Sequence, residues 1–528
     1  MNQSLPATSA APRCGLDVRR IARISAVSIC LLLVFFGPTD NWSWDPSFYY
    51  AQIRSPIVEH DLDFRNETHT GAFELPYTET GLQESPWPVG PSVLWSPFFL
   101  LGHGLMRLID PAHADGFDAL SLVSTMLGSI GYGLVGLMLI YAIACRLADR
   151  FAALIATALC CAATPLEFYL VRQPIMAHTT GLFSAALMLW IYLDLADGEQ
   201  PEWLSGLLFG VTLGLCFLTR WNGLLLAAVP GIYFLTYLRR AVISRSPALA
   251  WLVLAQSAIL VVAFLITLTP QIALWYQLHH KIVMMPQGSD AFVASIWPLN
   301  LPRALFDTNR GILFWCPFVL LGVIGAGFIR DARLRLLGGL LPTFQLVLIG
   351  YRVDWYSGGG FGARYMIELL PFIVPGFLAL LQRLPGRTLQ RWVLLACGAI
   401  LILHQLVLLY AVEHMAEGWI DPALYGKGLP LGLAWQWESV LRLLRDPALW
   451  LAPRPYVSVE RQAFLVNLLA GVRDPQAYRF SLLAAALTPL LVTGLSLFAQ
   501  LLHKRALARL LTAIALYFLG WAVFILLV

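Results

Sequence analysis

Charge is scarce in this sequence. Only 12% of its 528 residues are Asp, Glu, Lys or Arg, whereas about a quarter of the residues in a typical soluble domain are charged. Hydrophobic residues make up 58%, and the mean hydropathy is +0.70. The composition therefore excludes an ordinary soluble protein and predicts an all-α protein that crosses a membrane many times. The net charge of +4 is small for this length and gives no indication of a nucleic-acid partner.

Metal-ligand and nucleotide motifs are also missing. The eight cysteines lie mostly in apolar runs, and no CxxC or Cys/His pattern has the spacing of metal ligands. The one glycine-rich stretch, within 350–365, is not followed by the Gly-Lys-Ser/Thr of a Walker A loop. Internal repeats, low-complexity tracts and the inverted-repeat hydropathy of transporters are not found. We therefore interpret the cysteines as small core residues.

Long apolar runs fill most of the chain. A helix needs about 20 apolar residues to cross the roughly 30 Å of hydrocarbon in a bilayer. About thirteen runs meet this need, and they lie near 20–37, 119–144, 151–168, 178–195, 203–219, 222–238, 248–269, 312–329, 334–350, 366–382, 391–411, 482–502 and 508–527. The segment 91–108 has a shorter apolar core and contains Pro97, Gly102 and His103. We expect it to be an amphipathic helix on the membrane surface.

The basic residues predict which turns face the cytoplasm. With a cytoplasmic N-terminus and 91–108 on the surface, the inner turns read CRLADR, LADGEQPEW, YLRRAVISRS, RDARLR, QRLPGRTLQR and HKRALAR. All but LADGEQPEW carry basic residues, as the positive-inside rule requires. The same topology places long polar segments on the outer face, at 38–118, 271–311, 351–365 and 412–481. We therefore expect the functional surface to face outward.

The N-terminal segment has two interpretations. A basic tail before an apolar run also fits a signal peptide, but no small-x-small cleavage site follows, so we interpret 20–37 as an uncleaved first span. The expected organisation is a membrane module at 1–411 that includes the outer loop 38–118, a large outer loop at 412–481 with one or two short helices, and two C-terminal spans within 482–528.

The outer loop 38–118 carries the first candidates for chemistry. Asp45 precedes Pro46, which suits either a helix cap or a general base whose pKa is adjusted by a nearby apolar wall. Glu84 lies in ESPWPVGP, where it is either an ordinary solvated carboxylate or a side chain held by stiff turns. The aromatic residues expected to form sugar and lipid walls near Asp45 are Trp42, Trp44, Tyr49 and Tyr50.

Several cationic residues lie at the outer ends of predicted spans. His178 begins a span and is either a core or capping histidine or part of a site. Arg172 would meet a phosphate or extend to the interface. Arg220 opposes the positive-inside bias, so it either pairs with a loop carboxylate or binds an anion. Arg303 and Arg310 would add positive charge to the same outer region.

The stretch 350–365, GYRVDWYSGGGFGARY, is the second centre of interest. Glycine-rich backbone can bring its N–H groups close to a phosphate. Arg364 stands at the expected start of the next helix, where an anion is favoured. Trp355 is a candidate wall for the sugar. The alternative interpretation is a flexible turn between helices.

These segments together resemble a known family. The matching pieces are WDPSFYYAQIRSPIVEHDLDF, ESPWPVGPSVLWSPFFLL, RQPIMAHTTGLF, NRGILFWCPFVLLG and DWYSGGGFGARYMIELLP. In their order around the spans they are similar to the integral-membrane glycosyltransferases of the GT-C class. Within that class they resemble the bacterial relatives of protein O-mannosyltransferase and of lipid A aminoarabinose transferase.

The resemblance implies the partners of the reaction. The donor would be a sugar linked to polyprenyl phosphate, and the acceptor would be a glycolipid, a glycan or a protein. Transfer would invert the anomeric carbon, at a site on the outer, periplasmic face of the inner membrane. Some members use a divalent cation and some use none, and the residues here do not decide between them.

The resemblance also implies roles for individual residues. Asp45 would be the catalytic carboxylate, and Glu84 would match a second acidic residue ahead of the surface helix. Aminoarabinose transferase has Lys after that Glu, where this chain has Ser85. The remaining candidates for binding the phosphate are Arg172, Arg220 and Arg364.

Two other functions remain as alternatives. A transporter or flippase for lipid-linked sugars would place ionisable residues at mid-membrane in broken spans, whereas the charged residues here lie mainly in outer loops. An O-antigen ligase or polymerase would concentrate function in a late outer loop, for which 412–481 is a candidate. We favour a hexosyl- or pentosyltransferase with Asp45 as general base.

Overall fold

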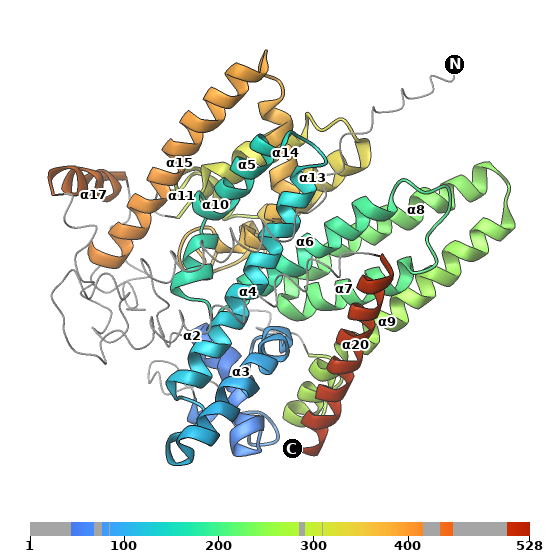
Figure 1. Cartoon of the computed structure of the whole chain (residues 1–528), viewed down its shortest axis with the longest axis vertical. Coiled ribbons are helices and arrows are strands. Elements are labelled where there is room, and N and C mark those ends of the chain that lie inside the picture. Colours follow the sequence, from blue (N-terminus) through green and yellow to red (C-terminus); the bar gives the residue numbers. More distant parts are fainter. Residues whose placement is uncertain are drawn as a thin grey trace.

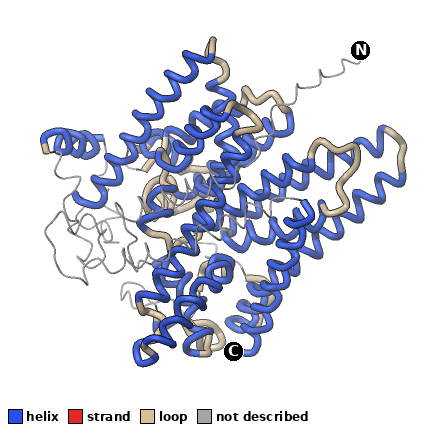
Figure 2. Tube along the Cα trace, viewed as in Figure 1, coloured by secondary structure: helices blue, strands red, loops and turns tan. Residues whose placement is uncertain are grey.

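The computed structural model describes residues 44–67, 77–83, 85–284, 291–308, 310–358, 360–415, 433–446 and 504–528. Throughout these residues the regular elements are helices, as Figure 2 shows, and strand-like pairing is limited to isolated bridges between Tyr77 and Gln83 and between Phe292 and Arg352. The predicted all-α class is therefore confirmed. The first predicted span, 20–37, and the span 482–502 lie outside the described residues.

The longer helices have these bounds in chain order: α2 Trp44–Arg54, α3 Gly90–Ile109, α4 Ala119–Ala144, α5 Arg150–Ala162, α6 His178–Leu195, α7 Ser205–Thr219, α8 Ala228–Ile243, α9 Pro247–His279, α10 Leu301–Phe306, α11 Ile312–Trp315, α12 Pro317–Ala326, α13 Ala332–Tyr351, α14 Leu370–Leu381, α15 Arg387–Met415, α17 Leu433–Arg445 and α20 Lys504–Leu527. Short π-helical turns are η1 Ser55–Glu59 and η4 Phe168–Arg172. Short 3-10 turns are η2 Phe64–Asn66, η3 Pro111–His113, η5 Trp221–Ala227 and η7 Arg364–Leu369. Figure 1 shows α4 crossing the middle of the molecule, with α2 and α3 beside its lower end and α15 and α17 to the left.

The structure confirms a multi-pass membrane protein. By length and composition, eight helical segments of the described chain can cross a membrane: Gly90–Ile109, Ala119–Ala144, Trp221–Ile243, Pro247–His279, Ala332–Tyr351, Arg364–Leu381, Arg387–Leu409 and Ala506–Leu527. Shorter apolar helices accompany them at Arg150–Ala162, Ser205–Thr219 and Pro317–Ala326. The predicted spans 119–144 and 178–195 coincide with α4 and α6.

Two predicted spans are shorter than expected because of proline. The span expected at 151–168 ends at Ala162, ahead of Pro165. The span expected at 312–329 is divided between α11 and α12, where Pro317 begins the second helix. Proline has no N–H to donate within a helix and restricts the residue before it. The hydropathy of these runs did not reveal the breaks.

The predicted surface helix 91–108 is α3, a helix of 20 residues with Pro97 inside it. It packs along α4 and contacts α2. Its length and composition would also allow it to cross a membrane, so its placement on the surface stays a prediction. One side of it is buried, and Leu108 and Ile109 at its end are exposed.

Close helix packing in the membrane module relies on glycine. α7 packs against α9 along Gly206, Gly210 and Gly214. A Cβ added at Gly206 would lie 2.3 Å from the Gln256 carbonyl oxygen, and one at Gly210 would lie 2.4 Å from that of Leu260. Small residues four apart let two helix backbones approach closely where no water drives association. Larger side chains here would separate α7 from α9.

A few element ends converge on one region of the module. η7 contacts α6, α13 and α14, while η5 contacts α6, α7 and α8. These contacts bring the start of α6, the junction of α7 with η5, and the start of η7 together. Side-chain contacts described below add the first turn of α2. Figure 1 shows α6 and α7 near the centre of the molecule, which gives this region a packed support.

Candidate active site

An ion pair joins the two residues that the sequence singled out at the start of α2 and of η7. Arg364 Nη1 donates to Asp45 Oδ2 at 2.6 Å, across a separation of 319 residues in the chain. The Asp45 and Arg364 side chains are only 12% and 9% exposed. Ion pairs shielded from water are stronger than surface pairs if the remaining polar atoms are satisfied. The structure therefore places the predicted base and the predicted phosphate-binding cation in one site.

The glycine-rich loop before η7 makes room for the Arg364 side chain. A Cβ at Gly360 would lie 2.5 Å from both Cδ and Nε of Arg364. Gly358 and Gly362 have φ of 57° and 61°, a region that L side chains rarely adopt. We expected these glycines to expose backbone N–H groups to a phosphate. The structure gives Gly360 another use, which is to let the loop lie flat against the guanidinium.

Two buried side chains hold this loop in place. The Phe361 N–H donates to the Tyr169 hydroxyl oxygen at 2.7 Å, and Arg310 Nη1 donates to the Gly360 carbonyl at 2.5 Å. The Arg310 guanidinium also lies 5.0 Å from the centroid of the Trp315 ring. Arg310 was expected to add charge to the outer region, and in the structure its hydrogen bond fastens the loop beside Arg364.

A second buried carboxylate lies one turn after Arg364. His178 Nδ1 donates to Glu368 Oε1 at 2.9 Å, and Arg220 Nε lies 3.4 Å from the same oxygen. A Cβ at Gly181 would come within 2.7 Å of Glu368 Cγ, so glycine lets the carboxylate approach α6. Of the two interpretations given for Arg220, the structure shows the ion pair with a carboxylate, which is Glu368. His178 hydrogen-bonds to the same carboxylate.

The sequence reasoning missed Glu368. It lies in the predicted span 366–382, in the otherwise apolar run MIELLPF. An ionisable residue in a membrane span is costly and usually functional, so this single Glu was the available signal. The expectation that the charged residues lie outside the spans therefore fails at this position.

Three guanidinium groups surround the ring of Tyr365. The Cζ atoms of Arg352, Arg364 and Arg220 lie 5.1, 5.6 and 5.7 Å from its centroid. The Tyr365 hydroxyl donates to Asp354 Oδ2 at 2.7 Å. The electron-rich face of an aromatic ring attracts cations, which allows like charges to gather here. Tyr365 and Arg352 were not among the predicted site residues.

Each of these cations has a carboxylate partner. The pairs are Arg364 with Asp45, Arg220 with Glu368, and Arg352 with Asp354. Arg352 holds Asp354 through both Nε and Nη2, at 2.6 and 3.0 Å. Burial alone would raise the pKa of Asp354, but the hydrogen bonds and charge of Arg352 lower it overall. The six side chains are therefore balanced in charge before any ligand binds.

Tyr49 rather than Tyr50 faces this site. The Tyr49 ring stacks on Trp87 at 6.2 Å and meets the edge of Trp95 at 6.1 Å. Its buried hydroxyl has no hydrogen-bond partner among the described residues. Burial raises the pKa of Tyr49, while the charge of Arg220 acts to lower it, so the hydroxyl stays a neutral donor. The Tyr50 hydroxyl instead donates to the Gly116 carbonyl.

The other predicted residues lie in different surroundings. Arg172 is buried at the end of η4, with 2% of its surface exposed. Trp355 is partly buried, and its ring is perpendicular to that of Tyr356 at 5.8 Å. Glu84 and Trp42 lie outside the described residues, and the described part of Trp44 does not include its side chain. The roles proposed for these residues stay predictions.

The carboxylates of the site bear on whether it could hold a metal ion. The described residues contain no group of three or more His, Cys, Asp or Glu side chains arranged to hold a metal ion. The donors nearest the site, Glu368 and Asp45, are already engaged by arginines.

Comparison with known protein families bears on the central part of the chain. Residues 117–275 match the model of the dolichyl-phosphate-mannose-protein mannosyltransferase family. The resemblance to the GT-C class is confirmed. The matched segment contains His178 and Arg220. No curated protein matches the chain.

Among solved structures, the chain is similar to two membrane transferases. ArnT from Cupriavidus metallidurans bound to undecaprenyl phosphate has 15% sequence identity and a TM-score of 0.47, with 91% of this chain and 77% of that chain covered. The oligosaccharyltransferase AglB from Archaeoglobus fulgidus, in complex with an inhibitory peptide and a dolichol-phosphate, has 14% identity and a TM-score of 0.36, with 89% and 56% covered. These likenesses are too distant to assign a role to any residue.

Proposed function

We propose that this protein is a membrane glycosyltransferase. It moves a sugar from a polyprenyl-phosphate-linked donor to an acceptor on the outer face of the membrane, with Asp45 as the general base. The observation that carries the proposal is the shielded ion pair between Asp45 and Arg364, beside Arg220 and Glu368. The family match over 117–275 supports the same class of reaction.

The donor phosphate binds by replacing Asp45 as the ion-pair partner of Arg364. The site is balanced in charge, so an incoming anion must replace a carboxylate as partner of one of its arginines. Arg364 is the best suited, because its Nε has no hydrogen-bond partner among the described residues and its present partner, Asp45, belongs to another element. Guanidinium groups bind phosphate oxygens through paired N–H donors. Arg352 and Arg220 keep their carboxylates and add to the positive field.

Binding of the phosphate frees Asp45 to act as a base. The acceptor hydroxyl or amine gives its proton to the Asp45 carboxylate while its oxygen or nitrogen attacks the anomeric carbon of the sugar. The bond from that carbon to the phosphate oxygen breaks, and its electron pair stays on the polyprenyl phosphate. Arg364 stabilises this developing charge. A single displacement of this kind inverts the anomeric carbon.

Tyr49 supplies a neutral hydrogen-bond donor to the same reaction. Its hydroxyl is buried among the charges of the site without a partner of its own. Buried polar atoms normally have hydrogen-bond partners, so we expect an atom of the bound ligand to accept the hydrogen bond of the Tyr49 hydroxyl. The rings of Trp87 and Trp95 that hold Tyr49 also provide flat apolar surface for a sugar.

The proposal includes the orientation of the protein. The inner membrane is crossed with the N-terminus in the cytoplasm, and Asp45 and Arg364 face the periplasm. The basic residues support this orientation. Arg239 lies near the C-terminal end of α8, and Arg330 and Arg383 follow α12 and α14. Because α8 and α14 begin directly after η5 and η7 of the site, their basic ends lie at the far side of the module. The transferred group is a hexose or a pentose, and the acceptor is a glycolipid, a glycan or a protein.

Mass spectrometry of envelope glycolipids and glycoproteins tests this function. A deletion strain is complemented with the wild-type chain, with Asp45→Asn or with Asp110→Asn. Asp110 is an exposed carboxylate bonded to His113, outside the site. The wild-type chain and Asp110→Asn should restore a sugar modification that the deletion removes, whereas Asp45→Asn should not.

Two outcomes would overturn the proposal. A surface glycan profile unchanged by the deletion would contradict glycosyl transfer to any envelope acceptor. Restoration of the modification by Asp45→Asn would remove Asp45 from the mechanism. Equal amounts of each variant in the membrane, shown by immunoblot, keep expression from producing either result.

A further inference from the structure

The helix α17 presents an apolar stripe that the described residues cover only in part. Trp437, Leu441 and Leu444 are 66%, 38% and 73% exposed and follow one another at helical spacing. Glu438 and Arg442 lie on another side of the helix, 3.8 Å apart and largely exposed. Helices that lie in the plane of a membrane surface typically have an apolar face that includes Trp and a polar face that includes arginines.

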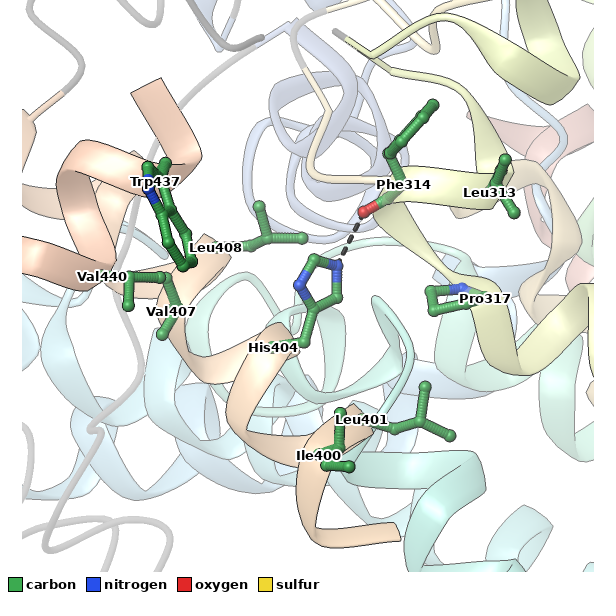
Figure 3. A pocket seen from close by; sticks show the side chains of 10 residues that line it. All are labelled: Leu313, Phe314, Pro317, Ile400, Leu401, His404, Val407, Leu408, Trp437 and Val440. Carbon is green, nitrogen blue, oxygen red and sulfur yellow. Dashed lines mark hydrogen bonds between the residues drawn. The ribbon is translucent and has the colours of Figure 1, made fainter. Parts of the chain in front are cut away.

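An apolar cavity of about 440 Å³ lies beneath this helix. The cavity is open on one side, and α17, α15 and the α11–α12 segment line it, with Trp437, Val440, Leu401, Val407 and Leu313 among its walls (Figure 3). Among the described residues that line it, the polar groups are the indole of Trp437 and the imidazole of His404, whose Nε2 already shares a hydrogen bond of 2.7 Å with the Phe314 carbonyl oxygen. Water needs several polar partners to occupy a cavity, so an apolar occupant fits this space better.

The cavity continues an exposed apolar face of α15. α15 can cross a membrane, and its Trp392, Ile400 and Leu403 side chains are 68%, 67% and 58% exposed. Ile400 belongs both to this exposed face of α15 and to the wall of the cavity. The cavity lies beside residues 400–408, near the end of the span Arg387–Leu409 that is far from the basic turn. This end is the outer one in the predicted topology.

We propose that α17 lies in the outer boundary of the bilayer and that the cavity beneath it binds an acyl chain of a membrane phospholipid. The apolar stripe of α17 rests among the chains next to α15, and its arginines reach the headgroup phosphates. One chain enters between Ile400 and Trp437 and fills the space. This site is independent of glycosyl transfer, since none of its residues belongs to the pairs around Arg364.

Photo-crosslinking in lipid nanodiscs tests the proposal. The full chain carries p-benzoyl-phenylalanine at Leu401 in the cavity, at Trp437 on its rim, or at Arg442 on the polar side of α17. Nanodiscs contain phosphatidylethanolamine and phosphatidylglycerol, and adducts are identified by intact mass. We expect a mass gain of one phospholipid at 401 and at 437, several-fold more abundant than at 442.

Every other outcome contradicts the proposal. A crosslink from 401 to a peptide of the same chain would show that a protein segment fills the cavity, and a crosslinked dimer would show a second copy. Equal lipid adducts at 437 and 442, or none at either, would show that α17 does not lie in the bilayer. Residue 437 is exposed, so that variant tests the proposal even if substitution at 401 prevents folding.

Discussion

Two adjacent tyrosines of α2 use their hydroxyl groups in different ways. Tyr50 donates to the Gly116 carbonyl and packs its ring against Phe99 and Phe117. Tyr49 has no such partner among the described residues and lies next to the charges of the site. The sequence suggested both tyrosines as walls of the site, because neighbouring tyrosines cannot be distinguished before the helix is oriented.

The two tyrosines should therefore respond oppositely to loss of the hydroxyl. Tyr49→Phe should lower the rate of transfer about tenfold and leave stability unchanged, since the lost hydrogen bond forms only with substrate. Tyr50→Phe should cost about 1 kcal/mol of stability and leave the rate unchanged. Thermal unfolding in detergent and transfer assays measure both. Equal effects of the two changes on the rate would contradict the orientation of α2.

Asp354 predicts how stability changes in acid. Its pKa is lowered in the folded protein from the usual 3.8, so the folded state binds this proton less tightly than the unfolded chain. The pair with Arg352 therefore contributes stability above the unfolded pKa and loses it as the pH falls through the folded pKa, below 3.8. Thermal unfolding measured from neutral pH down to below pH 3.8 should show a smaller decrease in melting temperature for Asp354→Asn than for the wild-type chain. Melting temperatures that fall equally with pH in both proteins would contradict this prediction.

Site residues could be identified from the sequence only where a charged residue lies next to a long apolar run. Asp45, Arg220 and Arg364 were found because each sits at the end of an apolar run. Glu368 was overlooked because it lies within one, and the aromatic centre Tyr365 carries no charge. Which carboxylate pairs with which arginine depends on contacts between distant elements, which spacing along the chain does not encode.

The glycine loop before η7 shows what an element contributes to the site. Its turn is held by Tyr169 and Arg310 on one side and passes directly over the Arg364 side chain. Because Gly360 has no Cβ, the loop and the guanidinium can touch. The orientation of Arg364 therefore depends on a position that bears no functional group.

Gly360→Ala should displace Arg364 and reduce transfer. The added Cβ would meet the Arg364 side chain at 2.5 Å, and misplacement of a positioning group by about 1 Å can cost about a hundredfold in rate. Gly339→Ala is the matched control, because a Cβ there meets nothing within 4 Å. Transfer rates of both variants give the answer. A normal rate for Gly360→Ala would contradict the contribution of this loop.

Helix positions were predicted well, and helix continuity was not. Apolar runs located α4 and α6 to the residue, because their hydropathy ends where polar residues begin. The breaks near Pro165 and Pro317 lie inside apolar runs, where the mean hydropathy does not fall and so does not mark the end of a helix. Proline was the sequence signal, and it is ambiguous in membranes, since Pro97 and Pro270 lie within continuous helices.

At the scale of the whole molecule, the membrane orientation connects the site to its substrates. A polyprenyl phosphate cannot leave the bilayer, so a site that uses it must lie near one surface. The arginine-rich turns predict the inner surface, and the C-terminal end of α3 and the loop after it lie at the opposite end of α4 from the turn before α5. The multi-pass architecture could be predicted from composition alone, whereas the sidedness depends on charges in short turns.

Labelling with a membrane-impermeant maleimide tests this orientation. Single cysteines replace His113 in the loop after α3 and Arg245 in the turn after α8, in a chain without other cysteines. Both positions are exposed. In intact cells only the cysteine at 113 should react, and after permeabilisation both should react. Labelling of 245 alone in intact cells would reverse the topology.

The central claim is that Asp45 serves as base once a phosphate has taken its place on Arg364. The most direct measurement compares Asp45→Asn with the wild-type chain in two quantities, the rate of sugar transfer and the affinity for polyprenyl phosphate. The account predicts that transfer falls at least about a hundredfold, while the lipid phosphate binds at least as tightly, because Arg364 no longer has to leave a carboxylate. A near-normal rate of transfer, or loss of lipid-phosphate binding in a folded Asp45→Asn protein, would contradict it.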